Sequence, residues 1–375
     1  MNKKDTNLCL VGHPYVPIGM GEHIRGTCRA LRSVVRRPVL LDIYKTVVPE
    51  ADELREFADF CTEEFRAINI FHINGNEVEQ ALKHLTHHRS LTGYNIIYPL
   101  WELPNYPEEW ARQLDRFDEI WAPSRFICDS LRPACSKPVF HLPMPCEPSL
   151  SSFLGRRYFR LPEADYTFLF FYDLRSFTTR KNPQAVVRAF RHLLEQRPFA
   201  KVHLALKVNG VETNPDEFSL LCDGLKDLKG HISIFHQVMT GNEVKNLVRC
   251  CDCFVSLHRS EGYGLGIAEA MVLGKPVIAT AYSGNMDFMD PAVSLGISYR
   301  LIPLTAGDYP YADGQVWAEP DWEEAAFCMT RLVDNPERGR RLGWLASRHM
   351  RQHFGYRPAG VRYIGRLEEI LRDTA

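Results

Sequence analysis

The chain has 375 residues, of which 45% are hydrophobic and 24% are charged, and its formal net charge is −1. This composition is typical of a soluble globular protein, and the balanced charge gives no overall field for binding nucleic acid. The eleven cysteines follow no regular framework, and no apolar run approaches the ~20 residues of a membrane span. We therefore expect a cytoplasmic protein with reduced thiols, and peripheral contact with the inner face of a membrane stays open.

In the first half of the chain, short apolar runs alternate with amphipathic segments. This alternation predicts βα units, and hence a parallel sheet covered by helices on both faces. The expected strands are residues 7–12, 37–43, 67–73, 94–100, 117–123 and 137–143. The expected helices are residues 21–34, 49–60, 76–87, 106–114 and 124–132.

Four prolines and several serines interrupt this rhythm between residues 143 and 164, which is typical of a linker. The alternation then resumes, with strands expected at 166–173, 201–208, 231–237, 251–257 and 275–280. Further helices are expected at 182–196, 321–334, 336–354 and 360–374. The pattern predicts an α/β protein with two Rossmann-like, doubly wound domains whose strand-end loops face a cleft.

The predicted domain boundaries follow from this break in the pattern. The first domain is 1–145, the linker is 146–165, and the second domain is 166–355. The C-terminal helix, 356–375, either caps the second domain or crosses back to the first.

Two strand-to-helix turns have residues suited to anions. In "PYVPIGMGEHIR", Gly19 and Gly21 would let the backbone approach a ligand closely, although a tight βα turn explains them equally well. In "DLRSFTTRKNP", Arg175 and Lys181 lie six residues apart, with Arg180 beside Lys181. Cations at a helix start suit a diphosphate, and a solvated basic loop is the alternative.

A third turn, "HRSEGYGLGIAEAMVLG", carries two carboxylates. Glu261 lies in the expected loop and Glu269 in the expected helix. Carboxylates accept hydrogen bonds from vicinal sugar hydroxyls, and the intervening glycines leave backbone amides open to sugar or phosphate oxygens. The alternative is that Glu261 caps the helix and that Glu269 lies on its solvent face.

These segments together resemble the retaining nucleotide-sugar glycosyltransferases of the GT-B fold, family 4. Glu261 and Glu269 match the E-x7-E motif of that family, and Arg175 and Lys181 match its diphosphate-binding segment. The resemblance is specific over about 165–290 and looser over 1–150. It implies that the first domain, 1–145, binds the acceptor and that the second domain, 166–355, binds the nucleotide sugar. It also implies that the C-terminal helix crosses back onto the first domain.

The resemblance implies a donor linked to UDP or GDP. Glu261 would contact the donor hexose, Glu269 the ribose, and Arg175 and Lys181 the leaving diphosphate. The implied donor-binding positions are Gly19, Gly21, Gln237, Val238, Met239, Gly262, Tyr263, Gly264, Leu265 and Glu269.

The first domain departs from the family where many members have a histidine. The segment "WELPNYPEEW" stands there and resembles a subgroup of polysaccharide, O-antigen and capsule transferases. Glu102 is therefore a candidate for orienting the acceptor or the donor sugar, or else a structural loop carboxylate. His72, Asn74 and Trp101 are candidates for the acceptor side, although His72 is equally compatible with a buried core histidine.

The predicted reaction is retaining transfer of a mannose-, rhamnose-, glucose- or galactose-type hexose to a glycan or lipid-linked glycan, in bacterial surface polysaccharide synthesis. We expect no cofactor and no metal, because the chain has no D-x-D segment and its cations can stabilise the diphosphate. A nicotinamide-dependent dehydrogenase would require a G-x-G-x-x-G fingerprint, which the sequence lacks. A non-catalytic, transferase-like subunit that binds carbohydrate remains the alternative.

Overall fold

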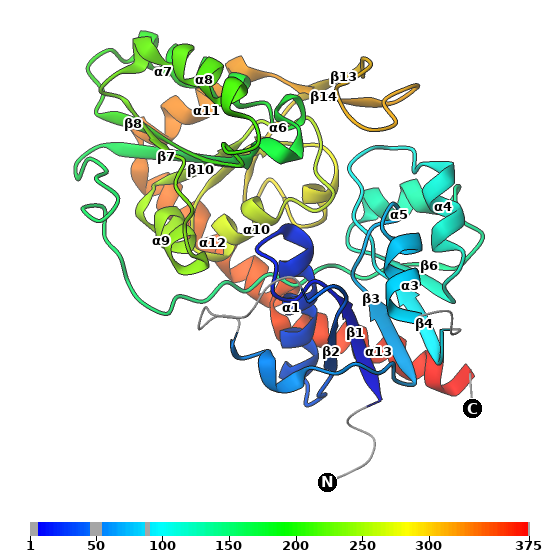
Figure 1. Ribbon diagram of the computed structural model, residues 1–375. Coiled ribbons are helices and arrows are strands. Elements are labelled where there is room, and N and C mark those ends of the chain that lie inside the picture. The colour runs from blue at the N-terminus through cyan, green and yellow to red at the C-terminus, as the bar shows by residue number, and fades with distance from the viewer. Residues whose placement is uncertain (1–6, 46–54, 87–90, 374–375) are drawn as a thin grey trace. The chain divides into compact units, whose positions relative to one another are not determined.

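The computed structural model describes residues 7–45, 55–86 and 91–373 (Figure 1). The chain divides into two compact units, one made of residues 1–147 and 351–375 and the other of residues 148–350. In the described residues, each unit contains a six-stranded parallel sheet with flanking helices, which confirms the predicted α/β class. The predicted helix 49–60 lies largely outside the described residues, and a short 3-10 helix, η1 (Ala58–Phe60), is found at its end.

The first unit is built on a sheet with the strand order β2-β1-β3-β4-β5-β6. Its strands are β1 (Leu8–Gly12), β2 (Val39–Asp42), β3 (Ile68–Phe71), β4 (Tyr94–Ile97), β5 (Glu119–Ala122) and β6 (Val139–His141). Its helices are α1 (Gly19–Ser33), α3 (Val78–Thr86), α4 (Glu108–Leu114), α5 (Arg125–Leu131) and α13 (Tyr356–Asp373). The direction of winding reverses between β1 and β3, and ligands of such sheets bind at the carboxyl ends of the strands at that point.

The C-terminal helix α13 belongs to this first unit and packs against α1. Their backbones come so close that a Cβ atom on Gly360 would lie 2.2 Å from the carbonyl oxygen of Ala30. The ring of Tyr363 is fully buried and stacks on Trp121, with 5.5 Å between the ring centroids. The last helix therefore completes the hydrophobic core of the first unit.

The second unit has the strand order β12-β11-β10-β7-β8-β9. Its strands are β7 (Tyr166–Asp173), β8 (Val202–Asn209), β9 (Ile232–Phe235), β10 (Cys253–Ser256), β11 (Val277–Thr280) and β12 (Leu295–Ile297). Its helices are α6 (Thr178–Lys181), α7 (Pro183–Gln196), α8 (Pro215–Asp223), α9 (Gly241–Cys250), α10 (Leu265–Val272), α11 (Trp322–Asp334) and α12 (Pro336–Phe354), the last of which continues into the first unit. Winding reverses here between β7 and β10, which makes their carboxyl ends the expected ligand site.

The segment predicted as a linker, 146–165, is mostly part of the second unit. Its backbone is held by α9, where Asn242 Oδ1 accepts the N–H of Ser151 at 2.9 Å and Asn246 Oδ1 accepts the N–H of Leu154 at 2.9 Å. The guanidinium of Arg156 pairs with Asp252 at 2.5 Å. The prolines and serines predicted a linker between domains. Instead, asparagine side chains of α9 accept hydrogen bonds from the backbone amides of Ser151 and Leu154 and hold the segment on the second unit.

An antiparallel hairpin, β13 (Tyr299–Pro303) and β14 (Val316–Pro320), was not predicted. Both strands are short and end in proline, which weakens the pattern of a strand in the sequence. In the described part of the chain, no helix has the length and apolar character needed to cross a membrane.

Two glycines of α13 test the packing of this helix. Gly360→Ala should lower the free energy of unfolding by about 1–3 kcal/mol, because the added methyl group meets a backbone carbonyl that cannot turn aside. A Cβ atom on Gly365 would have no neighbour within 4 Å. Gly365→Ala should therefore be stabilising by about 0.5–1 kcal/mol, through the better helix propensity of alanine. Urea unfolding of both variants measures the difference, and equal effects would contradict the close approach of α13 to α1.

Candidate functional site

The candidate site lies at the carboxyl ends of β7 and β10, where the winding of the second sheet reverses. These two strands are hydrogen-bonded neighbours. The loop after β7 leads into α6, which carries Arg180 and Lys181, and the loop after β10 carries Glu261. The topology therefore brings together basic and acidic residues that are 80 positions apart in the sequence.

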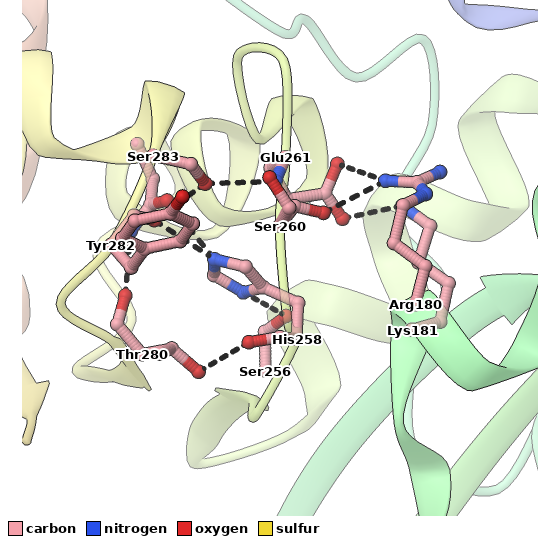
Figure 2. Close-up of polar contacts among 10 residues, drawn as sticks. Arg180, Lys181, Ser256, His258, Ser260, Glu261, Thr280, Tyr282 and Ser283 are labelled. Carbon is pink, nitrogen blue, oxygen red and sulfur yellow. Dashed lines mark hydrogen bonds and ion pairs between the residues drawn. The ribbon is translucent and has the colours of Figure 1, made fainter. Parts of the chain in front are cut away.

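Two cations converge on the carboxylate of Glu261 (Figure 2). Lys181 Nζ lies 2.5 Å from Glu261 Oε1, and Arg180 Nη1 lies 3.4 Å from Glu261 Oε2. The three side chains are largely buried, and that of Arg180 is only 4% exposed. Burial alone would raise the pKa of Glu261, but Lys181 and Arg180 outweigh it and lower the pKa to about 2. Glu261 is therefore a carboxylate at neutral pH.

Hydrogen bonds to the backbone fix the two loops to each other. Arg180 Nη1 donates to the carbonyl oxygen of Ser260 at 2.9 Å. In return, the N–H of Arg259 donates to the carbonyl oxygen of Arg180 at 2.8 Å, and Arg259 Nη1 donates to that of Thr179 at 2.7 Å. Arg180 and the backbone of α6 are thus held in place by hydrogen bonds that do not depend on the ion pairs with Glu261.

A buried histidine supports the loop from behind. The ring of His258 lies 3.1 Å from Ser256 Oγ and 3.0 Å from Asn285 Oδ1, and Thr280 Oγ1 donates to its carbonyl oxygen at 2.7 Å (Figure 2). Burial lowers the pKa of His258. The His258 ring is therefore neutral, because burial disfavours its charged form and its hydrogen-bond partners are uncharged.

The loop after β11 holds Glu261 by its backbone. Ser283 Oγ accepts the N–H of Glu261 at 2.8 Å, and the N–H of Gly284 donates to the carbonyl oxygen of Glu261 at 2.9 Å. The two loops approach so closely that a Cβ atom on Gly284 would lie 1.9 Å from the carbonyl oxygen of Gly262. This supporting loop could not be predicted from the sequence, because its contribution depends on backbone contacts.

The remaining residues of the glycine-rich turn have separate structural roles. Gly264 takes a φ of +89°, which favours glycine, and directly precedes α10, whose first residue is Leu265. Tyr263 is 3% exposed and packs on Phe288, with 5.2 Å between centroids, so its ring anchors the turn in the core. Glu269 lies in the second turn of α10 and is partly buried.

Arg175 does not contact Glu261. Its guanidinium makes a two-pronged ion pair with Asp173, at 2.9 Å from Nε and 2.7 Å from Nη2, and lies 4.0 Å from Glu212. Arg180 takes the place beside Lys181 on the Glu261 carboxylate. The adjacent Arg–Lys pair in "TTRKNP" was the available signal, but the predicted site residues included Arg175 and Lys181 and left out Arg180.

The segment Gln237–Met239 follows β9, at the same edge of the sheet. Gln237 and Val238 are exposed, and Met239 is partly buried. A capping box formed by Thr240 and Glu243 then starts α9. The predicted base-binding segment is thus a short exposed loop.

Four candidates of the first unit follow β1 and β3, where the winding of its sheet reverses. Gly19 starts α1 and is exposed, whereas a Cβ atom on Gly21 would lie 2.0 Å from the carbonyl oxygen of Val16. His72 is fully buried against His23, and this burial holds the pKa of His72 well below its usual range. Asn74 Oδ1 accepts the N–H of Leu100 at 2.8 Å and so ties the ends of β3 and β4 together.

Trp101 and Glu102 lie in the turn after β4. Trp101 is 2% exposed, donates to the carbonyl oxygen of Asn105 at 3.0 Å and packs on Trp110. It therefore shapes the turn from inside, and Glu102, which is partly buried, is held at the carboxyl end of β4. The described residues include no group of three or more His, Cys, Asp and Glu side chains that could hold a metal ion.

The ion pairs of Glu261 predict a pH-dependent contribution to stability. Glu261→Gln leaves two buried cations without their carboxylate and should lower the free energy of unfolding at neutral pH by about 3 kcal/mol. Because folding lowers the pKa of Glu261 from 4.5 to about 2, this contribution is complete above pH 4.5 and is lost as the pH falls toward 2.

Urea unfolding at a series of pH values measures this difference. Glu337→Gln is the matched control, because its ion pair with Arg340 is exposed and should contribute little. The free energies of unfolding of Glu261→Gln and the unmodified protein should converge as the pH falls. A difference that stays constant in acid would contradict the assignment of Glu261 as a carboxylate paired with two cations.

Comparisons with known proteins find glycosyltransferases that are similar to this chain. Residues 159–344 match the family model described as "Glycosyl transferases group 1". A D-inositol 3-phosphate glycosyltransferase of Thermomonospora curvata is 29% identical over 202 residues, which are 52% of this chain and 41% of that protein. A mannosylfructose-phosphate synthase of Agrobacterium fabrum is 26% identical over 111 residues, 28% of this chain and 24% of that protein. The matches thus span less than half the length of these curated relatives.

Solved structures resemble the whole chain in fold. A glycosyltransferase from Rickettsia africae has a TM-score of 0.71 at 13% identity and covers 98% of this chain and 99% of its own. Anabaena HepE in complex with UDP-glucose has a TM-score of 0.70 at 13% identity, and the match covers 96% of this chain and 99% of HepE. The two parallel-sheet units thus have the fold of GT-B glycosyltransferases, and residues 159–344 are similar to the group 1 glycosyl transferases.

Proposed function

We propose that the protein is a retaining glycosyltransferase that moves a hexosyl group from a nucleoside diphosphate sugar to an acceptor hydroxyl. The observation that carries this proposal is the convergence of Lys181 and Arg180 on the Glu261 carboxylate, at the reversal point of the second sheet. A carboxylate can orient sugar hydroxyls, and adjacent fixed cations can stabilise a leaving diphosphate.

The start of α10 supports the same assignment. The N-cap residue of this helix, Gly264, has no side chain that could cap it, and helix N-termini favour anions. In the proposed complex, the amides of Gly262 to Leu265 contact the sugar and the diphosphate. Glu269 binds the ribose hydroxyls, and Gln237–Met239 meets the base.

The cations divide into two groups in this proposal. Lys181 and Arg180 are already in place beside Glu261 and neutralise charge as the diphosphate leaves. Arg175 reaches the diphosphate only by leaving Asp173, so it contributes after the donor has bound. Cationic side chains thus stabilise the negative charge of the leaving diphosphate, and the proposed reaction uses no metal and no cofactor.

The reaction passes through an oxocarbenium-like transition state, as in glycoside hydrolysis. The bond between the anomeric carbon and the diphosphate oxygen breaks, and the acceptor oxygen bonds to the same face of the sugar. The departing phosphate oxygen takes the acceptor proton. Glu261 holds the sugar hydroxyls during this step.

The substrate classes are proposals that extend the comparisons. HepE was solved with UDP-glucose, which supports a UDP-linked hexose donor, and a GDP-linked donor remains the second choice. We propose a glycan or lipid-linked glycan as acceptor, in the synthesis of a bacterial surface polysaccharide at the inner face of the membrane. On the first unit, Glu102 is proposed to orient the acceptor or the donor sugar, with His72, Asn74 and Trp101 shaping that side.

A non-catalytic subunit that binds carbohydrate is the second candidate. Such a protein would need the sugar-binding carboxylate, but it has no use for cations that stabilise a leaving group. Arg180 is 4% exposed and hydrogen-bonded to the backbone of the Glu261 loop. This built-in positive charge favours catalysis over binding alone.

Hydrolysis of the donor separates the two candidates. Lys181→Ala and Glu261→Ala should each lower kcat for release of the nucleoside diphosphate by about 100-fold or more, the usual cost of removing a group that stabilises the transition state. Lys226→Ala is the matched control, because this lysine is exposed and pairs only with Asp223 among the described residues. Release that proceeds at the unmodified rate in both site variants would rule out the transferase.

A further inference from the structure

Aromatic side chains of the 299–320 hairpin segment contact both loops that support Glu261. Tyr309 packs on Phe177, in the loop before α6, with 4.7 Å between the ring centroids. Tyr299 packs on Tyr282, in the loop after β11, at 5.1 Å. The hairpin segment therefore places one ring on each side of the site.

The hairpin is fixed directly to the loop that carries Glu261. The N–H of Ala318 donates to the carbonyl oxygen of Arg259 at 3.0 Å. The guanidinium of Arg259 pairs with Glu319 at 2.6 Å and lies over the ring of Trp317, 5.6 Å from its centroid. These contacts join the hairpin to the residue two positions before Glu261, so the aromatic rings keep their place relative to the carboxylate.

Phe177 has a strained backbone. Its φ is +63° with ψ at 100°, a region that large side chains rarely adopt. The residue is nevertheless 38% exposed. Strained residues that stay exposed cluster at binding and catalytic sites, where the conformation has a use that offsets its energetic cost.

The position of the Phe177–Tyr309 pair points to a sugar. The guanidinium of Arg180 contacts both Glu261, 3.4 Å away, and the ring of Tyr309, 5.7 Å from its centroid. Arg180 therefore joins the aromatic pair to the carboxylate that faces the donor in the proposed reaction. Aromatic rings supply the flat apolar surface on which the C–H face of a pyranose packs.

We propose that Phe177 and Tyr309 form a stacking subsite for the pyranose ring of the acceptor. This inference rests on the proposed transfer reaction, in which Glu261 and its cations hold the donor. The acceptor ring would pack against Phe177 with its hydroxyl directed toward Glu261. The hairpin segment then determines which acceptor sugar is used.

Saturation-transfer NMR with methyl pyranosides of glucose, galactose, mannose and rhamnose tests the subsite. At least one pyranoside should receive saturation from the unmodified protein. Phe177→Asn and Tyr309→Ala should abolish this transfer. Asparagine tolerates a positive φ, so Phe177→Asn removes the ring and leaves the backbone conformation accessible. Equal transfer in these variants and in the unmodified protein, or no transfer from any pyranoside, would overturn the proposal.

Two controls separate stacking from a general loss of structure. Tyr309→Phe keeps the ring and should retain the transfer. Phe199→Ala removes a side chain that is 97% exposed, outside the hairpin and the site loops, and should also retain it. Loss of transfer in either control would contradict stacking at the Phe177–Tyr309 pair.

Melting temperatures with UDP- and GDP-sugars distinguish this inference from the proposed function. A donor bound only by the folded protein raises the melting temperature, and this shift should persist in Phe177→Asn. A donor shift without any pyranoside signal would overturn the subsite and leave the proposed function standing. Ring-dependent pyranoside binding without any donor shift would support the subsite as a sugar site and count against the transferase.

Discussion

The contact of Glu261 with Lys181 and Arg180 is the interaction on which the candidate site depends. Burying a carboxylate is costly unless cations accompany it, and here the two cations lower its pKa to about 2. These ion pairs also join the loop after β7 to the loop after β10, because Arg180 binds the backbone of Ser260 as well as the carboxylate of Glu261. Charge and loop geometry are thus set by the same residues.

The surrounding structure keeps this contact in one arrangement. His258 and Asn285 form a buried, uncharged network beneath the loop, and Ser283 and Gly284 bind the backbone of Glu261. The strained φ angles of Phe177 and Ser283, 63° and 74°, lie in these supporting segments. Such strain persists only where neighbouring contacts over-determine the conformation, and preorganised groups are those that stabilise a transition state most effectively.

Features that depend on local pattern could be predicted from the sequence. The alternating apolar runs predicted both parallel sheets, and the glycines after Glu261 predicted a turn leading into a helix. Features decided by a distant partner could not be predicted. Arg175 lies on Asp173 and Arg180 on Glu261 because of how the loops fold, and either arginine suited the diphosphate on spacing alone. The backbone of the proline-rich segment after residue 147 is held by Asn242 and Asn246, which lie about ninety residues further along the chain.

The central claim is that the strand-end loops of the second unit bind a nucleoside diphosphate beside Glu261. Titration calorimetry of UDP and GDP tests it directly, with the unmodified protein and with Lys181→Met. We predict that one of the two nucleotides binds with a stoichiometry of one, and that Lys181→Met weakens this binding at least about tenfold, the loss of one charge-assisted contact. Binding of neither nucleotide, or equal affinity in the variant, would contradict the account.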